Sequence, residues 1–94
     1  MTNQLLNHYK LIQKRGLITP ETTFSQFMDK LNEEWMEVCN AYADCIRDGK
    51  CPSDDLIYEM TDLLLVITNC FQHYGIDLSE QIAKNCKVQE GRIV

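Results

Sequence analysis

The sequence lacks the features that mark several common classes of protein. Its five cysteines include no C-x-x-C pair, which argues against a zinc ribbon and against a dithiol redox site. The longest aliphatic run covers residues 63–67, far less than a bilayer requires, and no signal-peptide pattern opens the chain. We therefore expect a cytoplasmic protein with no membrane partner, in which the cysteines, Cys45 and Cys51 among them, remain free thiols.

Basic charge is also scarce. The net charge is -5, and no cluster of Lys or Arg interrupts the acidic balance. Such a surface has no basic patch to which the phosphates of a nucleic acid could bind, so DNA and RNA are not expected as partners. The chain has no Walker-type glycine-rich loop, which means that any phosphate it binds must be held by other groups.

Few glycines and prolines are present, and they divide the chain into helical segments. Breaks are expected at Gly16, at Thr19-Pro20, from Gly49 to Pro52 and at Gly75. Possible N-caps precede the last three segments, each an oxygen-bearing side chain of Thr, Ser or Asp. Helices are therefore predicted at about residues 3–14, 23–48, 54–74 and 77–90.

The predicted fold class is all-α, because no segment alternates with period two. Residues 1–94 are expected to form one four-helix bundle-like domain, with the second and third helices as a long antiparallel pair. A chain of 94 residues leaves much of its surface exposed. We therefore expect oligomerisation to complete the fold, as a homodimer or a homotetramer.

Two pairs of acidic residues stand out, Glu34-x-x-Glu37 and Glu59-x-x-Asp62. Residues three apart share a helix face, so each pair can direct two carboxylates to one point. Most acidic pairs at this spacing are simply solvated helix faces. Four converging carboxylates, by contrast, form a site for a hard, oxygen-binding cation.

The third helix favours the second interpretation. Apolar residues cover nearly all of its sides, so we expect it to be buried. A narrow polar line crosses this surface and contains Glu59, Asp62, Asn69 and His73. A buried carboxylate without a partner is costly, and the few basic residues offer little compensation, with Lys30 the best placed. A bound cation is therefore predicted.

The cation is expected to be Mg²⁺, with Mn²⁺ as the alternative. A di-iron carboxylate bundle requires Glu-x-x-His, and neither His8 nor His73 has a glutamate three residues before it. Mg²⁺ usually binds through a few carboxylates together with substrate phosphates. The sequence therefore predicts a substrate that carries phosphate.

Two segments, Lys30-Leu31-x-Glu33-Glu34-x-x-Glu37 and Glu59-x-x-Asp62-Leu63, resemble the MazG-like all-α nucleoside triphosphate pyrophosphohydrolases, especially the short stand-alone members from phages and bacteria. Residues 15–18, 75–78 and 91–94 are similar too, so the resemblance covers most of the chain. It implies Mg²⁺-dependent cleavage of an NTP or dNTP between the α and β phosphates, which releases the monophosphate and pyrophosphate.

The resemblance also implies residue roles. Glu34, Glu37, Glu59 and Asp62 match the metal-ligand and catalytic positions, and either Glu37 or Glu34 is expected to be the general base. Members of the family often carry Lys-x-x-x-Asn-x-x-Arg on the last helix. This chain departs from that pattern, because Asn85 and Gln89 occupy the two places before Arg92. The remaining candidates for phosphate binding are Lys30, Lys84, Lys87 and Arg92.

Two other readings stay open. One is phosphoribosyl-ATP pyrophosphohydrolase, whose motif is similar and whose bond is of the same kind. The other is a non-catalytic helical interaction module, although four acidic residues at the ligand positions argue against lost activity. Trp35 and Tyr58 have the spacing of core residues and are interpreted as core rather than as groups that stack on a base.

Overall fold

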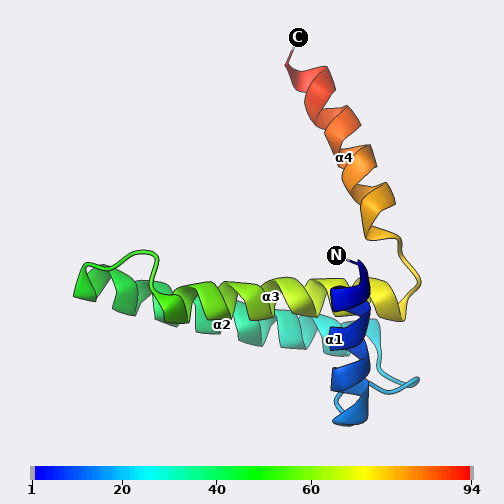
Figure 1. Ribbon diagram of the computed structural model, residues 1–94, viewed down its shortest axis with the longest axis horizontal. Helices are drawn as coiled ribbons and strands as arrows, with labels where there is room; N and C mark the ends of the chain where they lie inside the picture. Colours follow the sequence, from blue (N-terminus) through cyan, green and yellow to red (C-terminus); the bar gives the residue numbers. More distant parts are fainter. Residues whose placement is uncertain (1, 94) are drawn as a thin grey trace.

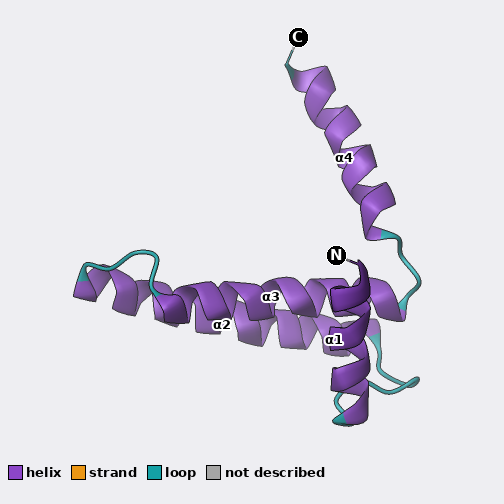
Figure 2. Cartoon of the chain, in the orientation of Figure 1, coloured by secondary structure: helices purple, strands orange, loops and turns teal. Residues whose placement is uncertain are grey.

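A computed structural model describes residues 2–93; Met1 and Val94, the two ends of the expected domain, lie outside the described residues. The described part contains four helices and no strand (Figure 2). They are α1 (Thr2–Lys14), α2 (Phe24–Asp48), α3 (Asp54–His73) and α4 (Leu78–Arg92). The all-α prediction is therefore confirmed, and each helix begins and ends within two residues of its predicted limits.

Side-chain caps explain where the helices begin. The Thr23 hydroxyl accepts a hydrogen bond from the Gln26 amide, and the Gln26 side chain accepts one from the Thr23 amide, which completes a capping box at α2. At α3 the Ser53 hydroxyl accepts a hydrogen bond from the Leu56 amide, and at α4 the Asp77 carboxylate accepts one from the Glu80 amide. At the other end of α2, Gly49 has φ of 69°, a conformation that glycine adopts without strain.

The antiparallel pair α2 and α3 is the main body of the molecule, and α1 crosses it at the end where α2 begins and α3 ends (Figure 1). Near the α2–α3 turn, the core contains Val38, Ala41, Cys45 and Leu56. A second core lies beneath α1 and contains Ile18, Phe27 and Cys70, with Tyr9 and Ile12 packed against it.

A hydrogen-bond chain through His73 fastens α1 and the following connection to α3. The Tyr9 hydroxyl lies 2.9 Å from His73 Nδ1, and His73 Nε2 lies 3.0 Å from the Thr22 carbonyl oxygen. Because the carbonyl can only accept, His73 Nε2 donates to it. His73, on the predicted polar line, therefore has a structural role.

Helix α4 projects away from the other three (Figure 1), and none of its described residues is buried. The radius of gyration is 15.8 Å, whereas a compact domain of this length has a value of about 12 Å. A single chain thus folds as a helix pair crossed by α1, with one helix unpacked.

The expected burial of the third helix is wrong for the single chain. Only Leu56, Thr68, Asn69 and Cys70 of α3 are buried, whereas Ile57, Met60 and Leu64 are about half exposed. The reason is that α1 and α2 cover only part of its circumference. Trp35 and Tyr58, interpreted as core residues, are likewise exposed.

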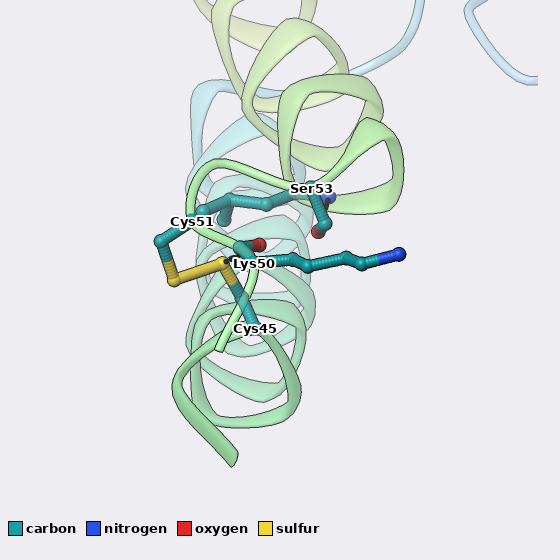
Figure 3. Close-up of a disulfide and its surroundings, with 5 residues drawn as sticks. Cys45, Lys50, Cys51 and Ser53 are labelled. Atoms are coloured by element: carbon teal, nitrogen blue, oxygen red, sulfur yellow. Dashed lines mark hydrogen bonds between the residues drawn. A yellow bond between two sulfur atoms is a disulfide. The ribbon is translucent and has the colours of Figure 1, made fainter. Parts of the chain in front are cut away.

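The cysteine prediction also needs correction, because a disulfide joins Cys45 to Cys51 (Figure 3). The turn at Gly49 reverses the chain at the end of α2 and brings the two Cα atoms within 5.3 Å, a distance that a disulfide spans. Cys39, Cys70 and Cys86 are free, as expected.

Among the described residues, no helix combines the length and the apolar character that a membrane span requires.

Candidate active site

The candidate site is a cluster of three carboxylates between the two long helices. Glu34 comes from α2, and Glu59 and Asp62 come from α3, where their spacing of three residues places them on one face. One oxygen from each of the three lies within 4.8 Å of the others. The Glu34 side chain is only 13% exposed, whereas that of the adjacent Glu33 is 70% exposed.

Glu37, the fourth predicted ligand, lies outside this cluster and is exposed. It follows Glu34 by three residues on α2, and its charge is one cause of the raised pKa of Glu59. Glu37 is therefore near Glu59 without sharing the common point where the other three carboxylates meet. The structure brings together three of the four predicted ligands in one cluster and places the fourth beside them.

The cluster carries a net negative charge, which Lys30 offsets only in part. Burial and then the charges of Glu37 and Asp62 raise the pKa of Glu59 above its ordinary value. Burial and then the charge of Glu34 raise the pKa of Asp62, against opposing effects of His8 and Lys30. Both shifts mean that the folded chain resists ionising these groups together.

Lys30 is the predicted phosphate-binding residue that lies at the cluster. Its Nζ atom is 3.2 Å from Glu34 and 3.5 Å from Glu33. Burial lowers the pKa of Lys30, but hydrogen bonds and charge from the two glutamates outweigh this effect, so the pKa is raised overall. Lys30 keeps its positive charge beside the carboxylates.

The other three predicted phosphate-binding residues, Lys84, Lys87 and Arg92, belong to α4. Lys84 pairs with Glu80 of the same helix at 3.4 Å. Because α4 projects away from the helix pair (Figure 1), a single chain does not bring these residues to the carboxylates.

A pocket of about 560 Å³ opens beside the cluster, a volume typical of small-molecule sites. Glu34, Asp62 and Lys30 form one part of its wall. The rest comes from α1, from the connection to α2, from the first turns of α2 and from α3. Those lining residues include His8, Ile12, Arg15, Ile18, Phe27, Leu65, Val66 and Asn69.

Sequence reasoning did not select His8, Arg15 or Asn69 as site residues. Asn69 had a partial signal, because it follows Asp62 on the polar line of the third helix. Arg15 had one only as the first residue of the segment 15–18 that resembles the family. His8 had none, since nothing in a single sequence indicates where α1 crosses the helix pair. Tyr58, interpreted as core, also lines the pocket.

The donor set fits a divalent cation. Carboxylate oxygens are the ligands of hard cations such as Mg²⁺ and Mn²⁺, and a cation between Glu34, Glu59 and Asp62 would offset the repulsion that raises the two pKa values. The adjoining pocket gives such a cation access to a ligand. The arrangement can therefore hold the charged end of a phosphate-bearing molecule.

Comparison with protein families identifies the family of this chain. A model of the phosphoribosyl-ATP pyrophosphohydrolase family matches residues 3–87, which include nearly all of α1, the whole of α2 and α3 and most of α4. This family lies within the MazG-like superfamily that the motifs resemble. Comparison with curated proteins and with solved structures gave no match. The chain belongs to the phosphoribosyl-ATP pyrophosphohydrolase family and is a nucleotide pyrophosphohydrolase, a hydrolase that acts on phosphoric anhydrides.

Proposed function

We propose that this chain is a Mg²⁺-dependent nucleoside triphosphate pyrophosphohydrolase, with Mn²⁺ as a substitute cation. It cleaves an NTP or dNTP between the α and β phosphates and releases the monophosphate and pyrophosphate. The observation that carries the proposal is the convergence of Glu34, Glu59 and Asp62 beside a pocket large enough for a nucleotide, whose wall includes Glu34 and Asp62.

In this proposal Glu34, Glu59 and Asp62 hold the cation, and Glu37 completes the set from its position beside Glu59. When bound, the cation neutralises charge on the phosphate oxygens and lowers the pKa of the attacking water. Lys30 contributes a positive charge at the same wall, next to the place where the phosphates lie. The protein thus supplies charge and positioning, which is what phosphoryl chemistry mainly requires.

The general base is Glu37 or Glu34, and the structure favours Glu37. The Glu34 carboxylate already accepts a hydrogen bond from the Lys30 ammonium, and its side chain is only 13% exposed. Glu37 is exposed and close to the cluster, so it can orient a water molecule toward the α phosphorus and take its proton. The bond that breaks is the one from the α phosphorus to the bridging oxygen, which leaves with the pyrophosphate.

The second candidate substrate is phosphoribosyl-ATP, which the description of the matching family favours. A panel of four NTPs, four dNTPs and phosphoribosyl-ATP, with Mg²⁺ and scored for pyrophosphate release, tests both. Turnover of phosphoribosyl-ATP alone would replace the first candidate with the second. Glu37→Gln should abolish turnover without loss of helix content, while Asp44→Asn, an exposed acid on the same helix, serves as the matched control.

We further propose that the active enzyme is a homodimer or a homotetramer. Large apolar side chains are exposed along the helix pair, among them Trp35, Tyr42, Met60 and Leu64. Their burial in a second copy would complete the core that one chain leaves open. It would also provide a surface on which α4 can pack, so that Lys84, Lys87 and Arg92 of one copy can reach the phosphates at another.

A further inference from the structure

Lys30 places a permanent positive charge at the carboxylate cluster. Its ammonium lies 3.2 Å from Oε1 of Glu34, and its charge also lowers the pKa of Asp62 on the neighbouring helix. His8 acts on Asp62 in the same direction, and its ring contacts the Asn69 amide, with Nδ1 3.2 Å from Nδ2. An imidazole is only partly charged near neutral pH, whereas a lysine ammonium stays charged. Lys30 is therefore a counter-ion that the chain itself supplies to the cluster at every physiological pH.

The same ammonium has a second partner outside the cluster. Glu33 Oε2 lies 3.5 Å from Lys30 Nζ, and the Glu33 side chain is exposed. Both contacts follow from helical spacing, because Glu33 and Glu34 come three and four residues after Lys30 and share its side of α2. The Lys30 side chain is itself 54% exposed. Its flexible stem is therefore free to move between a carboxylate of the cluster and one beside it.

A divalent cation and the Lys30 ammonium compete for Glu34, which is the member of the cluster that α2 provides. A cation held by Glu34 and Asp62 would lie close to an ammonium that both carboxylates attract. Like charges a few ångströms apart repel one another even at the dielectric constant of water. The contact between Lys30 and Glu34 should therefore weaken the binding of a free cation.

A phosphate at the pocket wall changes this balance. Lys30, Glu33, Glu34 and Asp62 all line the pocket, so a phosphate bound beside the cluster is accessible to the ammonium. Hydrogen bonds between an ammonium and phosphate oxygens are charge-assisted and strong. The phosphate would draw Lys30 away from Glu34, while Glu33 keeps the side chain at the wall. A cation that arrives on phosphates then finds Glu34 free, whereas a cation that arrives alone does not.

We propose that Lys30 is an internal counter-ion of the cation site, which occupies Glu34 until phosphates draw it away, and that Glu33 is the positioning residue that retains it at the pocket wall. The site thereby favours a cation already bound to the phosphates of the substrate over a free cation. The inference rests on the proposed function, because it takes Glu34, Glu59 and Asp62 to hold the cation. It adds the form in which the substrate enters, as a complex with its cation.

The test compares Lys30→Met with the wild type, and Lys10→Met, at an exposed position of α1, is the matched control. Methionine keeps an unbranched side chain and a high helix propensity, and it removes the charge. Calorimetric titration with Mg²⁺ alone, and with Mn²⁺ alone, should give Lys30→Met a Kd about five- to tenfold lower, because a competing charge is gone. Binding of pyrophosphate at saturating Mg²⁺ should instead weaken about tenfold. Lys10→Met should match the wild type in every titration.

Glu33→Gln tests the positioning role. Without its second partner, Lys30 should remain on Glu34, so free Mg²⁺ should bind about threefold more weakly than to the wild type. The charge of Glu33 also attracts a cation directly, and the same substitution in the Lys30→Met background measures that part. A positioning role gives a larger effect in the wild-type background. Equal effects in the two backgrounds would show that Glu33 acts through its own charge alone, which overturns its assigned role.

The outcomes separate this inference from the proposed function. If the wild type releases pyrophosphate from a nucleotide and Lys30→Met binds free Mg²⁺ no more tightly than Lys10→Met, the inference fails and the proposed function stands. Weaker binding of free Mg²⁺ by Lys30→Met would also overturn the inference, because Lys30 would then support the cation rather than compete with it. If the wild type binds neither Mg²⁺ nor Mn²⁺, with or without pyrophosphate, both fail together.

Discussion

The carboxylate cluster predicts that Asp62→Asn is more stable than the wild type without Mg²⁺ and less stable than the wild type when Mg²⁺ is added. Without a cation, Asp62 and Glu34 place two negative charges within 4.8 Å, and burial adds to the cost of ionising Asp62. Asparagine keeps the shape of the side chain and removes the charge. Without Mg²⁺, the variant should therefore be more stable than the wild type.

The size of the effect follows from this distance. Two unit charges 4.8 Å apart repel by about 1 kcal/mol in water and by about 3.5 kcal/mol at an effective dielectric constant of 20. The site is half-buried, and the amide loses some solvation, so we expect a net gain of about 1–2 kcal/mol. For a domain of this size, that corresponds to a rise in Tm of roughly 5–15 °C.

Mg²⁺ should reverse this order. A cation at a hundred times its Kd stabilises the wild type by about 2.7 kcal/mol, whereas Asp62→Asn loses a ligand and should gain much less. Urea denaturation at fixed protein concentration, in EDTA and in excess Mg²⁺, measures both values. Asp44→Asn should behave like the wild type. The metal-site reasoning is refuted if Asp62→Asn is the less stable protein in EDTA and still gains as much from Mg²⁺ as the wild type does.

Three further predictions concern pH, the disulfide and assembly. The folded chain retains protons on Glu59 and Asp62 at pH values where the unfolded chain, with ordinary pKa values of 4.5 and 3.8, has released them. The stability of the metal-free protein, measured relative to Asp62→Asn, should therefore decrease as pH rises above about 4; a rise would contradict the assigned repulsion. Cys51→Ser removes the cross-link at an exposed position and should lower the free energy of unfolding, measured by urea denaturation, by about 2 kcal/mol. Cys86→Ser removes a free thiol and is the neutral control. Equal stabilities of the two variants would show that the disulfide does not hold the turn. Leu64→Glu places a charge on the exposed apolar side of α3. It should reduce the mass measured by light scattering to that of one chain. An unchanged mass would exclude this surface from the interface.

Local signals were enough to predict the helices and much of the cluster. The Thr23 and Gln26 capping box, the Ser53 and Asp77 caps and the turn at Gly49 act over a few residues, so they can be recognised in the sequence. Glu34, Glu59 and Asp62 could be selected because helical spacing and the apolar surroundings of the third helix are both readable from the chain.

The features that depend on distant contacts could not be predicted. The His8–Asn69 contact depends on the angle at which α1 crosses α3, which no local pattern encodes. The Cys45–Cys51 bond was missed because the spacing of two cysteines does not reveal the turn between them. Burial of the third helix was expected from composition, but composition does not distinguish a surface covered by the same chain from one available to another.

Helix α4 has a consequence for how the protein behaves on dilution. It has 15 residues, and none of its described residues is buried. Isolated helices of about this length are marginal in water, because few hydrogen bonds offset the cost of nucleation. The last helix should therefore unwind when no neighbour covers it, and the far-ultraviolet circular dichroism per residue should weaken as the protein is diluted. The helical content of the C-terminal segment would then report directly on the fraction of chains that are assembled.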